Sequence, residues 1–145
     1  MDLIQKKLIE RQKNINKLLE TDGILGEPKK TIADGYKEFI HGFRKYVEEN
    51  LHEEINVDDI ATHMNMSRSK FYRQLKEITD YSPTDLINIV KLKKATHIMI
   101  NEHKTISEAA FASGFASPSY FTKTFIKFYK QRPSDYIKSR LNVSH

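Results

Sequence analysis

Two stretches of this 145-residue chain combine an apolar helical stripe with side chains that hydrogen-bond well to nucleic acids. The stripe residues recur every three or four positions, and they are Phe71, Leu75 and Ile78 in residues 67–79 and Phe121, Phe125 and Phe128 in residues 118–129. The side chains left outward or flanking are Arg68, Ser69, Lys70, Tyr72, Arg73, Gln74, Lys76, Ser119, Tyr120, Thr122, Lys123 and Lys127. Arg and Lys can pair with guanine edges, and Ser, Thr, Tyr and Gln can contact bases or phosphates. Both stretches are therefore candidate base-reading helices.

The residue patterns that carry catalysis or metal binding are missing from the sequence. No cysteine occurs, which excludes disulfides, Cys-based zinc sites and Cys nucleophiles. The GxSxG, phosphate-loop and HExxH motifs are absent as well. No two histidines stand three or four residues apart with carboxylate support, and the six are His41, His52, His63, His97, His103 and His145. We therefore expect no enzyme activity, no cofactor and no metal site.

Charge is distributed unevenly along the chain. Lys and Arg number 24 against 19 Asp and Glu, which gives a net charge of +5. Residues 46–65 contain six acids and no Lys or Arg, whereas residues 66–145 contain 14 Lys and Arg against six acids. A basic half favours a polyanion such as double-stranded DNA as the partner, although surplus surface lysine explains the charge equally well. The acidic segment is interpreted as a solvated face turned away from DNA, with a contact to RNA polymerase as the alternative.

No segment of the sequence is suited to a membrane. The longest uncharged run, residues 109–122, has 14 residues and includes Gly114 and Pro118, so it is too short and too broken to span a bilayer. Lys6 and Lys7 interrupt the N-terminus, where a signal peptide would need an apolar stretch. We expect a soluble, cytoplasmic protein and no membrane contact by these 145 residues.

The elements that must position the candidate side chains are expected to be helices throughout. Only five Gly and four Pro occur, and β-type alternation is absent. Residues 2–20 carry a heptad-like stripe of Ile4, Leu8, Ile15 and Leu18. This stripe predicts an amphipathic helix that pairs in a homodimer, or one that frays in isolation. The predicted division is an N-terminal helix and linker over residues 1–35 and a second domain over residues 36–145, opening with a core-facing helix near residues 35–50.

Beyond residue 50 the chain repeats itself. Residues 56–61 match residues 105–110 at an offset of 49, and each segment opens with a capping residue followed three positions later by an acid. After the turn the offset becomes 50, because one residue is inserted. Asn65 and Gly114 occupy equivalent turn positions, where a left-handed backbone is needed.

Each half of the repeat is therefore predicted to be a helix, a tight turn and a second helix. Ser67 and Ser117 are expected to cap the second helices. Between the halves, residues 83–101 are predicted to form a linker helix about 27 Å long. A helix-turn-helix normally places its second helix in the major groove of DNA.

Residues 57–136 resemble the DNA-binding domain of AraC/XylS-type transcriptional regulators. The most specific motifs are Ile106-Ser107-Glu108-Ala109-Ala110, then Gly114-Phe115-Ala116-Ser117-Pro118-Ser119-Tyr120-Phe121, and finally Pro133-Ser134-Asp135-Tyr136. The resemblance extends over residues 39–141. It implies an all-α fold of seven helices, in which two helix-turn-helix subdomains are joined by a long helix. It also implies that the two recognition helices enter successive major grooves on one face of the DNA.

The resemblance also assigns roles by position. The base-reading residues it implies are Ser69, Tyr72, Arg73, Ser119, Tyr120, Thr122 and Lys123. The phosphate contacts it implies are Ser67, Lys70, Gln74, Lys91 and Ser117. For Tyr72 and Tyr120, a packing role is an equally good interpretation. The sequence departs from the family at Asp80 and Lys130, where glycine is usual, and Lys tolerates a left-handed backbone less readily than Asp.

The first 35 residues resemble the segment that joins a response-regulator receiver to such an output domain. This resemblance implies a two-component regulator, and the family leans toward activation of transcription. The alternative is a helical protein–protein interaction module without specific DNA binding. Salt dependence separates the two, because a duplex contact to about eight phosphates predicts a log–log affinity slope near −7.

Overall fold

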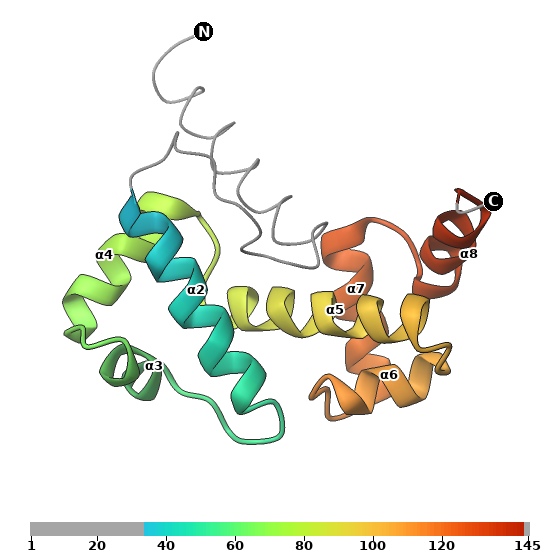
Figure 1. Ribbon diagram of the computed structural model, residues 1–145, viewed down its shortest axis with the longest axis horizontal. Helices are drawn as coiled ribbons and strands as arrows, with labels where there is room; N and C mark the ends of the chain where they lie inside the picture. The colour runs from blue at the N-terminus through green and yellow to red at the C-terminus, as the bar shows by residue number, and fades with distance from the viewer. Residues whose placement is uncertain (1–33, 144–145) are drawn as a thin grey trace, which may run out of the picture. The chain divides into compact units, whose positions relative to one another are not determined.

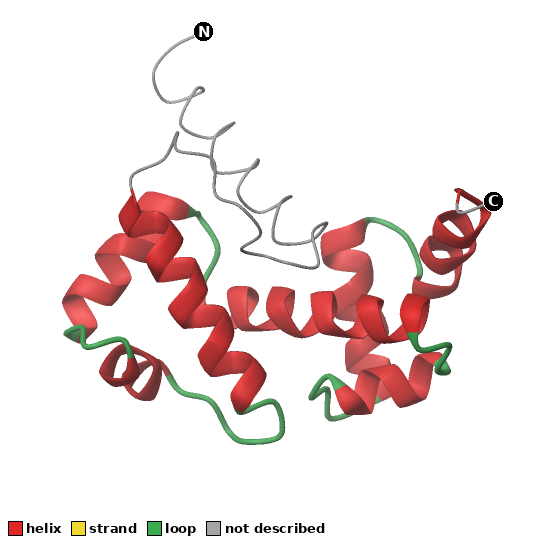
Figure 2. Ribbon diagram, in the orientation of Figure 1, coloured by secondary structure: helices red, strands yellow, loops and turns green. Residues whose placement is uncertain are grey.

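The computed structural model describes residues 34–143, and every regular element in that range is an α-helix (Figures 1 and 2). The helices are α2 (Asp34–Glu49), α3 (Val57–His63), α4 (Arg68–Ile78), α5 (Pro83–Asn101), α6 (Ile106–Ala112), α7 (Pro118–Tyr129) and α8 (Pro133–Val143). The all-α expectation is confirmed for this range, and none of these helices is long and apolar enough to cross a membrane. The predicted helix of residues 2–20 and its linker lie outside the described residues.

The chain divides into two compact units. One ends at Val90 and the other begins at Lys91, so that α5 contributes residues to both. Buried side chains occur on several faces of this helix, as expected for an element that packs within two cores. They include Leu86, Ile89, Leu92 and Ala95.

The core of the first unit is built on three phenylalanines. Phe39 and Phe43 lie one turn apart on α2, and their rings lie 5.3 and 6.2 Å from the ring of Phe71 on α4. All three side chains are buried, together with Ile60 of α3 and Leu75 of α4. The helices α2, α3 and α4 all contact one another, so the apolar stripe of α4 faces inward and its polar face is left outside.

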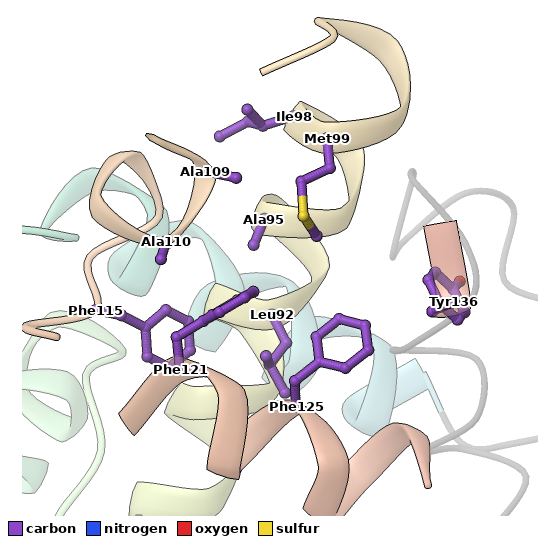
Figure 3. Packing of buried hydrophobic residues seen from close by; sticks show 10 residues of the cluster. All are labelled: Leu92, Ala95, Ile98, Met99, Ala109, Ala110, Phe115, Phe121, Phe125 and Tyr136. Carbon is purple, nitrogen blue, oxygen red and sulfur yellow. The ribbon is translucent and has the colours of Figure 1, made fainter. Parts of the chain in front are cut away.

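The core of the second unit gathers around α7 (Figure 3). Phe121 and Phe125 are fully buried, and the ring of Phe115 lies 5.1 Å from that of Phe121. Tyr136 of α8 packs against Phe125 with ring centroids 5.6 Å apart. The same cluster takes in Leu92 of α5 and Ala109 and Ala110 of α6. Buried aromatic rings contribute strongly to packing, and here they join α7 and α8.

The helix starts are fixed by the capping residues that the sequence predicts. The Thr105 hydroxyl accepts a hydrogen bond from the Glu108 N–H at 3.1 Å, and the Glu108 carboxylate accepts one from the Thr105 N–H at 2.9 Å, which completes a capping box. Asn56 makes the looser version, in which only its side chain accepts from the Asp59 N–H at 2.9 Å. Ser67 and Ser117 cap α4 and α7.

The two tight turns have the same hydrogen bonds. The Met66 N–H donates to the Ala61 carbonyl at 2.8 Å, and the Phe115 N–H donates to the Ala110 carbonyl at 3.0 Å. A second bond, from Asn65 to Thr62 and from Gly114 to Phe111, makes each turn a Schellman motif. Asn65 and Gly114 have φ of 56° and 95°, which confirms the predicted left-handed positions. The sequence repeat at an offset of 49 residues is therefore also a repeat of the backbone conformation.

The structure departs from the sequence expectations in the burial of α7 and in the turn after α4. Phe128 is only partly buried against the second core, whereas Thr124, not expected there, is buried. Lys130 takes the left-handed conformation at φ 62° although Lys tolerates it less readily than Gly, and its N–H closes α7 by donating to the Ile126 carbonyl at 2.9 Å. The corresponding turn after α4 avoids a left-handed residue: Thr79 is extended, and its hydroxyl accepts from the Tyr81 N–H at 3.1 Å.

Candidate nucleic-acid interface

The outer face of α4 presents three of the predicted base-reading residues. Ser69, Tyr72 and Arg73 are all exposed. Their spacing of three and four residues places them on one side of the helix. Phe71 and Leu75 anchor the other side in the first core. The burial of α4 therefore determines which of its side chains face a partner.

The outer face of α7 presents the corresponding residues of the second helix-turn-helix. Ser119, Thr122 and Lys123 stand 50 positions after Ser69, Tyr72 and Arg73, in the same i, i+3, i+4 pattern. Ser119 and Lys123 are exposed, and Thr122 is half-buried. We call each set of three a triad. Both triads combine one cation with two hydroxyl groups, which suits hydrogen bonding to base edges.

Tyr120 lies outside the second triad and next to the core. Its ring centroid lies 6.1 Å from that of Phe115, yet 45% of the residue remains exposed. One side of the ring therefore packs against the turn residue while the rest stays accessible. The structure is compatible with both interpretations that the sequence left open.

The phosphate candidates on α4 border a cavity of about 280 Å³ in the first unit. Lys70 and Gln74 form one wall, and residues of α2, α3 and the turn form the rest, namely Glu38, Phe39, Gly42, His63, Met64 and Met66. The amide oxygen of Gln74 is buried without a hydrogen-bond partner in the described part of the chain. Ser67 uses its hydroxyl oxygen to accept from the Lys70 N–H at 3.1 Å.

Two phosphate candidates adjoin the turn of the second helix-turn-helix: Lys91 reaches it from α5, and Ser117 follows it as the N-cap of α7. The Lys91 ammonium donates to the Gly114 carbonyl at 3.2 Å, and burial lowers the pKa of Lys91 below its ordinary value. Ser117 is half-buried, and its hydroxyl accepts from the Tyr120 N–H at 3.1 Å. Lys91 thus braces the turn that precedes α7, a contact that joins residues 23 positions apart and leaves no local signal in the sequence.

An ion pair between α3 and α4 lies beside the first triad. Arg68, the first residue of α4, donates from Nη1 to Asp58 Oδ1 of α3 at 2.8 Å. The Arg68 guanidinium also lies 5.5 Å from the ring centroid of Tyr72. The sequence marks Arg68 as a polar residue of the helix but gives no sign of its pairing with Asp58. No cluster of three or more His, Asp or Glu suited to a metal ion occurs among residues 34–143.

Comparison with known proteins agrees with this geometry. The helix-turn-helix domain family matches residues 60–139, more than half of the chain. The chain is 29% identical over 107 residues to histidine kinase P4 of Formosa agariphila, a match that covers 73% of this chain and 8% of the kinase. It is 26% identical over 95 residues to the HTH-type transcriptional activator RhaS of Escherichia coli, covering 66% of this chain and 34% of RhaS.

A solved structure shares the fold. The crystal structure of a DNA-binding transcriptional dual regulator from Escherichia coli K-12 matches with a TM-score of 0.59 and 23% identity, covering 70% of this chain and 96% of that chain. This chain spans only about a third of RhaS and less than a tenth of the kinase. The family match falls on both repeats described above. The chain therefore belongs to the AraC-type helix-turn-helix family of DNA-binding transcription regulators.

Proposed function

We propose that this chain binds a specific double-stranded DNA sequence and regulates transcription, with α4 and α7 as recognition helices in successive major grooves. The observation that carries the proposal is the duplicated interface: two Schellman turns of the same geometry, two serine caps and two exposed triads at matching positions. A single helical hairpin is common in proteins that do not bind DNA. Core packing alone does not require exposed side chains of the same kind to repeat together with the turn.

The roles within the interface follow from what each side chain offers. The two triads, with Tyr120 beside the second, contact base edges. Ser67, Lys70, Gln74, Lys91 and Ser117 contact phosphates and set the register of each helix. The Lys91 ammonium has three N–H donors, so it can contact a phosphate while one of them donates to the Gly114 carbonyl.

Selection of bound sequences from a random duplex pool at moderate salt tests this proposal. Two enriched blocks about 10 bp apart, one helical turn, are expected if both recognition helices engage. One block would restrict base reading to one helix. Weak, salt-sensitive binding without enrichment would contradict sequence-specific recognition by the isolated chain. An absence of binding would instead favour the protein–protein interaction module.

We further propose that the chain is the output part of a two-component regulator that activates transcription. The match to a histidine kinase supports the first point, and the match to a transcriptional activator supports the second. Transcription in vitro from a promoter that carries the selected operator should rise when the protein is added. A fall would identify a repressor. A receiver or kinase encoded in the same reading frame or beside it supports the two-component role, and its absence contradicts it.

The remaining assembly proposals concern residues 1–35 and the acidic segment. We propose that residues 2–20 pair two copies of the chain and that residues 36–145 form the DNA-binding domain. Equilibrium sedimentation that shows only monomer at high concentration would remove the dimer. Limited proteolysis should cut before residue 36 and leave a fragment that still binds DNA. A contact of RNA polymerase with the acidic face predicts variants that bind the operator normally but activate less.

A further inference from the structure

The ion pair between Asp58 and Arg68 joins the two helices of the first helix-turn-helix beside its triad. Asp58 lies in the first turn of α3, and Arg68 is the first residue of α4. Their side chains meet at 2.8 Å although they remain 67% and 62% exposed. An ion pair this exposed contributes little to folding stability, because water screens the charges. The hydrogen bond nevertheless orients the Arg68 guanidinium, because Nη1 donates to Asp58 Oδ1.

The guanidinium is held over an exposed aromatic ring of the interface. Its central carbon lies 5.5 Å from the ring centroid of Tyr72, which is one turn further along α4 and 37% exposed. The edge of Tyr72 also meets Phe71, with centroids 5.9 Å apart and the rings perpendicular. Tyr72 is thus braced between the core and a cation whose position depends on Asp58. A braced ring loses less side-chain freedom on meeting a base than a free one.

Without Asp58, the Arg68 guanidinium would be available to contact a DNA phosphate. Arg68 starts α4 and follows Ser67, where phosphate contacts are proposed. Arginine pairs well with phosphate through its planar set of donors. A carboxylate 2.8 Å away competes directly with a phosphate for these donors. Asp58 therefore keeps the Arg68 guanidinium from pairing with a DNA phosphate, a contact that would not depend on the base sequence.

The second helix-turn-helix has no such arrangement. The positions that correspond to Asp58 and Arg68 are Ser107 and Pro118, and neither carries a charge. Any effect of the pair must therefore be confined to the half of the DNA site that α4 contacts. This asymmetry supplies an internal control.

We propose that Asp58 is a specificity-determining positioning residue, which holds Arg68 against Tyr72 and away from the phosphate backbone. This inference rests on the proposed DNA binding. It predicts that loss of the Asp58 charge strengthens binding to unrelated duplexes and weakens discrimination at the α4 half-site. Discrimination at the α7 half-site stays as it was.

The test compares four variants of the full chain with the unsubstituted protein. Asp58→Asn breaks the pair, and Asp58→Glu keeps it. Asp59→Asn removes the same charge from the adjacent residue, which lies outside the Arg68 pair, and so serves as the matched control. Arg68→Lys keeps a cation beside Asp58 but removes the planar guanidinium. Circular dichroism and the thermal midpoint verify that each variant is folded.

The affinity of each variant is measured for the selected operator, for operators scrambled in one half-site, and for an unrelated duplex, between 50 and 200 mM salt. Asp58→Asn should make the log–log salt slope steeper by about 0.9, since one more phosphate is neutralised. It should also reduce discrimination at the α4 half-site by about three- to tenfold. Arg68→Lys should lose discrimination without a steeper slope, and Asp58→Glu should behave as the unsubstituted protein.

Three results would overturn the proposal. Asp58→Asn and Asp59→Asn could change every affinity alike, which would indicate only a long-range charge effect. Discrimination could fall equally at both half-sites, which would indicate a general disturbance of the fold. Finally, the unsubstituted chain could show no sequence preference, which would refute the proposed function and this inference together, whereas the first two results refute the inference alone.

Discussion

Replacement of Arg73 by alanine distinguishes base reading from phosphate contact on α4. Arg73 is exposed on the face opposite Phe71 and Leu75, so its truncation removes no core packing. We expect the free energy of unfolding to stay within about 0.5 kcal/mol, as for most surface substitutions. The whole consequence should then appear in DNA binding.

The magnitude follows from the contact that an arginine in this position can make. A bidentate pair with a guanine edge contributes about 1–3 kcal/mol of discrimination. This corresponds to a loss of about five- to 150-fold in affinity for the selected operator. The loss should vanish on a duplex in which the contacted base pair is already replaced. Lys123→Ala on α7 should produce the equivalent pattern at a base pair of the other half-site.

The assay is a titration of the operator and of every single-base variant, repeated at several salt concentrations. Lys37→Ala, which removes one exposed cation from α2 in the same unit, controls for net charge. A uniform loss across all duplexes, with a salt slope shallower by about 0.9, would make Arg73 a phosphate contact. That result would refute the assignment of the first triad.

Three further variants test other parts of the site and the fold. Lys91→Met should weaken all duplexes alike and make the salt slope shallower by about 0.9 in binding titrations, whereas a changed base preference with an unchanged slope would contradict its phosphate role and show that it acts through the turn that it braces. Lys130→Gly should stabilise the protein by up to about 1 kcal/mol in denaturant titrations, because it relieves a left-handed residue, while the control Asp80→Gly should not stabilise it. Hydrogen bonds from Thr105 lower the pKa of Glu108, so its contribution to stability is present above its unfolded pKa of about 4.5 and is lost as the pH falls through the lower folded value. Glu108→Gln should therefore flatten the fall in thermal midpoint as the pH drops below about 4.5, and an unchanged pH profile would contradict the linkage.

The helix starts and the tight turns were predictable because each depends on fewer than seven consecutive residues. Thr105 and Glu108 meet within one turn of the helix. Asn65 adopts a left-handed backbone, which asparagine tolerates because its short polar side chain can hydrogen-bond locally. The outward faces of α4 and α7 were predictable for a related reason. Once Phe71 and Phe121 are buried, the helical period determines which side chains point away.

The contacts between elements were not predictable in this way. Arg68 and Asp58 are ten residues apart on different helices, and Lys91 reaches a carbonyl 23 residues further along. At the end of α7, the helical period favoured burial of Phe128. In the structure Tyr129 stacks on Phe125 at 4.3 Å, Tyr136 packs against both rings, and Phe128 is only partly buried. Such outcomes depend on how helices dock, which one sequence does not encode locally.

The two triads differ in chemistry although their scaffolds repeat. The caps and turns are bonded to backbone groups, so a change there costs stability. The exposed triad residues contribute little to folding and are free to differ, as Arg73 differs from Lys123 and Tyr72 from Thr122. Under the proposed function, one repeated backbone thus presents two chemically different faces to DNA. Asp58 limits this freedom in the first helix-turn-helix alone, because there the orientation of Tyr72 is tied through Arg68 to α3.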